Sequence, residues 1–132
     1  MYFRENYHTD AAPQAIGPYS QAVRAGDLVF ISGQIPLDPM TMELVDGDFR
    51  RQVEQVLTNI EAVVSAAGGT LCEVVKVTVF MTDLSKFEVV NEVLDEYFLE
   101  PYPARAAVGV AALPKGAEVE MEAIMHVSAE GE

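Results

Sequence analysis

The residue best suited to chemistry in this chain is Arg105, which opens a run of small apolar residues in the stretch YPARAAVGV, residues 102–110. An unpaired guanidinium beside a strand that is headed for burial is costly unless an anion meets it. That anion is either a carboxylate of the protein itself or a bound acidic ligand. The pattern around Arg105 alone leaves both interpretations open.

A second chemical pattern is the stretch EVEMEA, residues 118–123, in which three glutamates alternate with apolar residues. Successive side chains of a strand point to opposite faces, so one face is acidic and the other belongs against helices. The simplest interpretation of the acidic face is a solvated surface. On the preceding strand Arg105 shares a face with Ala107 and Gly109, and such small residues favour close approach of another surface, such as a second subunit.

The two patterns lie far apart if the last two strands form a simple hairpin. With Leu113 paired to Glu118, Arg105 lies opposite His126 and Glu120 is about 20 Å away along the ladder. Arg105 and Glu120 would then meet only across a subunit interface. A bulge in either strand would change this register.

Two helices are predicted between the strands. Apolar residues recur at helical spacing over residues 49–67, with Asp48 as N-cap and two glycines at the end. A second helix is predicted to begin at SKFE, where Ser85 and Glu88 have the spacing of a capping box, and to stop before Pro101.

The remaining segments read as strands. Residues 16–34 contain two short strands joined by a turn at Gly26, and EVVKVTVFMTDL reads as a central strand. The loop that follows the first two strands, residues 35–48, is predicted to lie on the surface because prolines interrupt it. The closing strands are separated by a turn around Lys115 and Gly116. The predicted order is β-β-α-β-α-β-β, an α+β fold over residues 1–132 as one domain, with both helices on one face of the sheet.

The amino-acid composition limits the classes of partner and cofactor that we expect for this protein. Eight basic against 21 acidic residues give a formal net charge of -13, which repels a phosphate backbone, so no nucleic-acid partner is expected. No long apolar run predicts a membrane span or a signal peptide, and we expect a cytoplasmic protein. Cys72 is the only cysteine and is interpreted as a structural, partly buried thiol. With only two histidines, no metal site is expected.

Several motifs together resemble one known family. IGPYSQA, ISGQIP, AAGG, KVTVFMTDL and YPARAAVGVAALPKGAEVEMEAI are similar to the RidA/YjgF family of reactive intermediate deaminases, also labelled endoribonuclease L-PSP, from about Ala15 to Met125. The resemblance implies a chorismate-mutase-like fold and a homotrimer with a central barrel and active sites between subunits. It also implies hydrolysis of enamines and imines such as 2-aminoacrylate, 2-iminopropanoate and 2-iminobutanoate to 2-oxo acids and ammonia, with no cofactor or metal.

The resemblance also implies roles for individual residues. Arg105 matches the arginine that binds the substrate carboxylate, and Glu120 matches the glutamate that orients or activates water. The other residues that it places at the cleft are Tyr19, Ser32, Gly33, Phe87, Asn91 and Ala107. Ala107 stands where many members of the family have cysteine, so a thiol role is impossible here, whereas a backbone carbonyl at that position can still hold a water. Addition of water to a C=N carbon requires no covalent nucleophile.

Two other functions compete with the deaminase. One is a noncatalytic trimer that binds small carboxylates such as 2-oxo acids and regulates a partner. The other, less favoured, is an endoribonuclease or translation inhibitor, against which the acidic balance and the scarcity of histidine argue.

Overall fold

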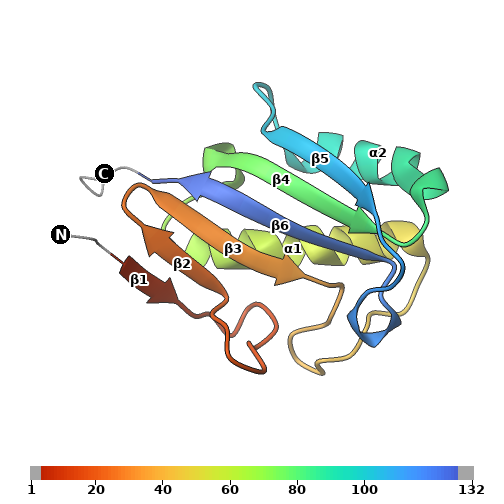
Figure 1. The fold of residues 1–132 in the computed structure, drawn as a ribbon, viewed down its shortest axis with the longest axis horizontal. Helices are drawn as coiled ribbons and strands as arrows, with labels where there is room; N and C mark the ends of the chain where they lie inside the picture. Colours follow the sequence, from red (N-terminus) through yellow and green to blue (C-terminus); the bar gives the residue numbers. More distant parts are fainter. Residues whose placement is uncertain (1–3, 128–132) are drawn as a thin grey trace.

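The computed structural model describes residues 4–127, which form one six-stranded sheet with two α-helices on one face (Figure 1). The strands are β1 Arg4–Tyr7, β2 Ala22–Ala25, β3 Leu28–Gln34, β4 Val74–Met81, β5 Ala104–Gly109 and β6 Val119–His126. The helices are α1 Phe49–Ala66 and α2 Phe87–Tyr97. The predicted α+β class is confirmed, with both helices covering the same face.

The order of strands in the sheet is β1-β2-β3-β6-β4-β5, and every pair is antiparallel except β4 with β5. The alternation predicted for the last strand is confirmed, because Val119 and Met121 on β6 are fully buried toward the helices while Glu120 and Glu122 lie on the opposite face. This uncovered face carries exposed apolar side chains, among them Phe30 at 45% exposure.

The predicted pairing of the last two strands is wrong. β5 pairs in parallel with β4, with Arg105 opposite Val77, whereas β6 lies between β3 and β4, with Glu120 opposite Phe80. Parallel neighbours need a crossover connection, and α2 supplies it between β4 and β5. The strongly apolar face of β6 belongs at the sheet centre, where helices cover it, and the small residues of β5 go to an exposed edge.

The first hairpin is confirmed, since β2 and β3 pair across a turn in which Gly26 has φ 64°. The structure adds a strand that the sequence did not predict, β1, at the other edge of the sheet. Its sequence RENY has no apolar alternation, because all but one of its residues are exposed. The order of elements is therefore β-β-β-α-β-α-β-β.

The first helix agrees closely with its prediction, and Asp48 caps it by accepting a hydrogen bond from the Arg51 backbone N–H at 3.0 Å. The capping box predicted for the second helix is wrong. A short 3-10 turn, Leu84–Lys86, precedes α2, and Asp83 accepts from both the backbone N–H and the hydroxyl of Ser85. Cys72 is exposed rather than partly buried, because it lies in a short 3-10 turn at the surface.

The loop between β3 and α1 is tied to the helix by one buried amide. Asn59 of α1 is fully buried, and its Nδ2 donates to the carbonyl oxygens of Ile35 at 3.3 Å and Leu37 at 3.0 Å. The amide of Gln55 donates in turn to Asn59 Oδ1 at 2.8 Å. The predicted surface loop is therefore anchored at its start, with Leu37 buried.

Candidate active site in two halves

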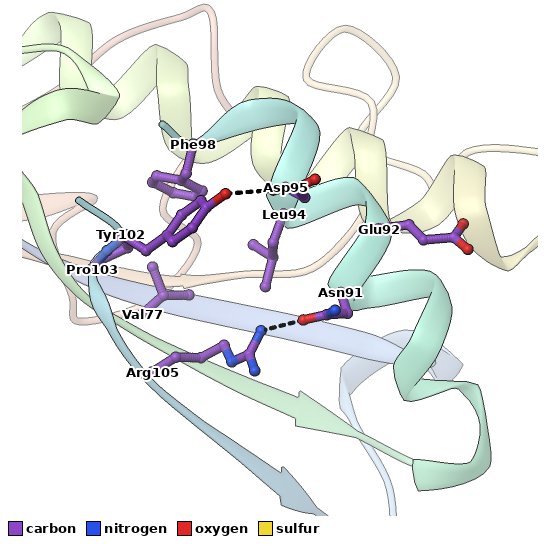
Figure 2. A pocket seen from close by; sticks show the side chains of 9 residues that line it. All are labelled: Val77, Asn91, Glu92, Leu94, Asp95, Phe98, Tyr102, Pro103 and Arg105. Carbon is purple, nitrogen blue, oxygen red and sulfur yellow. Dashed lines mark hydrogen bonds between the residues drawn. The ribbon is translucent and has the colours of Figure 1, made fainter. Parts of the chain in front are cut away.

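Five of the residues expected at one cleft divide between two cavities, and Ser32, Phe87 and Ala107 line neither. The first, about 510 Å³, lies between α2 and the start of β5 (Figure 2). It is lined by Val77, Asn91, Glu92, Leu94, Asp95, Phe98, Tyr102, Pro103 and Arg105. The second, about 470 Å³, lies at the end of β3. It is lined by Pro13, Gln14, Ile16, Tyr19, Gly33, Gln34, Ile35, Leu37, Met42, Pro114, Lys115 and Glu120.

Arg105 is held in the first cavity by two neutral contacts from α2. Its Nη1 donates to Asn91 Oδ1 at 2.7 Å, and its guanidinium carbon lies 4.9 Å from the centroid of the Phe87 ring. No carboxylate within residues 4–127 forms a salt bridge with it. The guanidinium is therefore oriented, exposed and not neutralised, which leaves N–H groups free for an anion.

Figure 2 shows that the first cavity has chemically different ends. Arg105 and Asn91 lie at one end, and at the other the Tyr102 hydroxyl donates to Asp95 Oδ1 at 2.6 Å. This hydrogen bond raises the pKa of Tyr102. The sequence analysis missed Asp95 and Tyr102, because neither belongs to a recognisable spacing pattern. The contrast of a cationic end with an acidic end is visible only in the folded chain.

Glu120 lies in the second cavity with two of its expected neighbours, Gly33 and Tyr19. Burial raises the pKa of the Glu120 carboxyl group, and the charge of Glu122 raises it further. The backbone of Gly33 lies directly against this carboxylate, since a Cβ added to Gly33 would be 2.1 Å from Glu120 Oε2. Only glycine therefore admits the present position of the Glu120 side chain.

Tyr19 is 52% exposed, and its hydroxyl oxygen accepts a hydrogen bond from the backbone N–H of Ile16 at 3.4 Å. Ser32 does not line either cavity. Its hydroxyl donates to the backbone oxygen of Ser20 at 2.5 Å, so its proton is already used in holding β3 to the preceding loop. Ala107 lies exposed on β5, outside both sets of lining residues.

Within one chain the two cavities cannot act on the same small molecule. Arg105 contacts α2 and so lies on the helix side of the sheet, while Glu120 lies on the uncovered side. Their backbones are separated by β4 and by three residues along the strands, or about 14 Å at ordinary strand spacings. Arg105 and Glu120 therefore lie apart as expected, but at about 14 Å rather than about 20 Å, and because of the strand order rather than a hairpin.

The described residues contain no cluster of three or more His, Cys, Asp or Glu side chains arranged to hold a metal ion. Within the same part of the chain, no helix has both the length and the apolar character needed to cross a bilayer.

The fold is that of a family of small α+β proteins. The model of the endoribonuclease L-PSP family matches residues 9–127, so the chain belongs to this family, and the relationship to RidA proteins expected from the motifs is confirmed. Protein DfrA of Myxococcus xanthus is 54% identical over 123 residues, covering 92% of this chain and 94% of that protein. A protein of Dermatophagoides farinae named 2-iminobutanoate/2-iminopropanoate deaminase is 49% identical, covering 90% of this chain and 93% of that protein.

Solved structures give the same assignment. RidA from an Antarctic Psychrobacter is 57% identical with a TM-score of 0.90, covering 93% of this chain and 99% of that one. TdcF of E. coli, solved with bound serine, is 44% identical with a TM-score of 0.87, covering 94% and 99% of the two chains. The coverages show that the shared fold extends over nearly the whole of both chains.

Proposed function

We propose that this protein is a deaminase that hydrolyses 2-imino acids and their enamine tautomers, working as a homotrimer with its active sites between subunits. The observation that carries the proposal is Arg105, an oriented guanidinium with no acidic partner among residues 4–127, in a chain of net charge -13. In a chain so rich in carboxylates, an arginine left without one is available for an acidic ligand. The deaminase name of the mite relative and the serine bound to TdcF support a small amino-acid-like substrate.

The proposed assembly follows from the split of the site. Each chain carries Arg105 in one cavity and Glu120 in the other, on opposite sides of the sheet. A contact between the first cavity of one subunit and the second cavity of the next is heterologous, and such contacts close into a ring when the rotation permits. The exposed edge strand β5 and the exposed apolar side chains of the uncovered face, such as Phe30, provide the surface for this contact.

The chemistry is water addition to a polarised carbon. Arg105 binds the substrate carboxylate and so places C2, the carbon of the C=N bond, near Glu120 of the neighbouring subunit. The Glu120 carboxylate accepts a proton from water as the water oxygen adds to C2, and returns that proton to the nitrogen. The carbinolamine then collapses: its hydroxyl proton passes to the amino nitrogen, the C–N bond breaks as C=O forms, and ammonia leaves a 2-oxo acid. An enamine substrate first accepts a proton at C3 and loses one from its nitrogen, which converts it to the imine tautomer.

The environment of Glu120 suits this role. Its carboxyl group has a raised pKa, which brings a general base closer to neutral pH and strengthens it as a proton acceptor. Gly33 leaves space for the carboxylate, and Tyr19 borders it. No covalent step is needed, so the alanine at position 107 does not prevent the reaction.

The test couples the protein to an enzyme that generates 2-aminoacrylate from serine and measures the rate of pyruvate release. Wild type should accelerate release, and Arg105→Ala should abolish the acceleration while retaining the wild-type mass in solution. Arg4→Ala is the matched control, because Arg4 is also an exposed arginine whose side chain donates to an asparagine, Asn6. Full activity in Arg105→Ala, or a monomeric wild type, would refute the proposal.

The same variants separate the competing functions. A regulator of the noncatalytic kind would bind 2-oxobutanoate in calorimetry through Arg105 and show no turnover. An endoribonuclease would show an RNA-cleaving activity that copurifies with the protein and that falls in Arg105→Ala. We expect turnover of the imine and no RNA cleavage, because the net charge of -13 opposes binding of a polyanion.

A further inference from the structure

The second cavity contains both residues of the described chain that combine a side chain with left-handed backbone. Among residues 4–127, only Met42, with φ 61°, and Lys115, with φ 59°, have positive φ without being glycine. Both line the cavity that contains Glu120. Side chains with a Cβ rarely adopt this conformation, which favours glycine or asparagine. Such residues gather at functional sites, so the methionine side chain at position 42 calls for an explanation.

Met42 is held firmly in this conformation. Its backbone N–H donates to the Asp38 carbonyl oxygen at 2.7 Å, and the Asp38 N–H donates to the Glu43 carbonyl oxygen at 2.9 Å. Leu37 and Leu44 form a β-bridge at the base of this turn, and Asn59 fixes the Leu37 carbonyl from below. The backbone of Met42 is therefore fixed, and its side chain projects from a defined point of the cavity wall.

Most of that wall is apolar. Ile16, Ile35, Leu37 and Met42 line it together with Tyr19, and Glu120 is the one acidic residue among the described residues of this lining. The cavity volume of about 470 Å³ is within the range of sites for drug-sized ligands. A three-carbon imino acid fills only a small part of such a space. The apolar remainder is suited to a longer hydrocarbon side chain.

We infer, resting on the proposed function, that Met42 and Ile16 form the subsite for the substrate side chain. The subsite favours imines derived from larger apolar amino acids over those derived from alanine. The geometry supports this role because the carboxylate is bound by Arg105 and the C=N carbon lies at Glu120, so the side chain extends along the apolar wall. A methionine suits the position, since its unbranched thioether adapts to side chains of different shape.

The test compares kcat/KM for the imines of leucine and alanine, each generated in the assay by an amino acid oxidase. Wild type should prefer the leucine-derived imine. Met42→Gly, which removes the side chain and suits the left-handed backbone, should lower this preference roughly tenfold, and Ile16→Ala should lower it in the same direction. Met40→Gly is the matched control, because Met40 is in the same loop, is 87% exposed and does not line the cavity.

The outcomes are distinct. A wild type that prefers the alanine-derived imine, or a preference unchanged in both Met42→Gly and Ile16→Ala, would overturn the subsite while leaving the deaminase intact. If wild type hydrolyses neither imine, the proposed function fails, and calorimetry with 4-methyl-2-oxopentanoate and pyruvate tests the subsite alone. Tighter binding of the larger acid, lost in Met42→Gly, supports the subsite, whereas equal or absent binding overturns it.

Discussion

Replacing Gly33 with alanine tests the position of the Glu120 carboxylate without removing it. The added Cβ would lie 2.1 Å from Glu120 Oε2, whereas ordinary contact begins at 3.4 Å. The carboxylate oxygen must therefore move by about 1.3 Å. The colliding atom is at the far end of a flexible side chain, so the shift costs about 1 kcal/mol or less in stability.

The effect on catalysis should be much larger than the effect on stability. A displacement of about 1 Å in a reacting group costs on the order of 100-fold in rate. We expect kcat/KM of Gly33→Ala to fall about 100-fold, which corresponds to about 2.7 kcal/mol of transition-state stabilisation. The measurement is the imine hydrolysis assay beside a thermal melt of each variant.

Gly109→Ala on β5 is the control for adding a methyl group to the sheet. Its Cβ would lie 3.1 Å from the Cδ1 of Leu84, a side chain that is 51% exposed and free to turn away. Activity should stay within about twofold of wild type, because the clash is relieved without moving a reacting group. In a Glu120→Gln background, Gly33→Ala should add almost no further loss. If Gly33→Ala melts normally and retains wild-type kcat/KM, the present position of Glu120 is not its working position.

Three further predictions follow from buried and paired polar groups. Asn59→Ala should lower the free energy of unfolding by about 3 kcal/mol, since it leaves the Leu37 carbonyl and other polar groups unpaired, and urea titration measures it. The raised pKa of Glu120 means that stability falls as pH rises through that pKa; Glu120→Gln should therefore melt above wild type at neutral pH, and the two melts should coincide well below pH 4.5. Lys86 lowers the pKa of Glu118 across a 2.7 Å ion pair. The pair therefore stabilises the folded protein above the ordinary pKa of 4.5, and this stabilisation is lost as Glu118 is protonated in acid. Lys86→Met should melt slightly below wild type at neutral pH and at the same temperature as wild type in acid.

Local patterns in the sequence predicted the elements that surround the site. The alternation along β6 follows from its burial on one side only, and α1 follows from apolar spacing and the Asp48 cap. The family motifs indicated the candidate site residues, and three of these, Glu120, Gly33 and Tyr19, line one cavity. The strand and the helix are readable because each depends on residues that are near neighbours along the chain, whereas the cavity residues were identified through the family motifs.

The tertiary structure alone decided how the site is divided. The position of β6 between β3 and β4 depends on which strand best fills the sheet centre beneath the helices. The hydrophobic periodicity of a single strand does not determine that position. Strand order then places Arg105 and Glu120 on opposite sides of the sheet, and loop packing onto Asn59 brings Met42 to the cavity. Sequence periodicity reports whether a face is buried, whereas long-range packing determines what it is buried against.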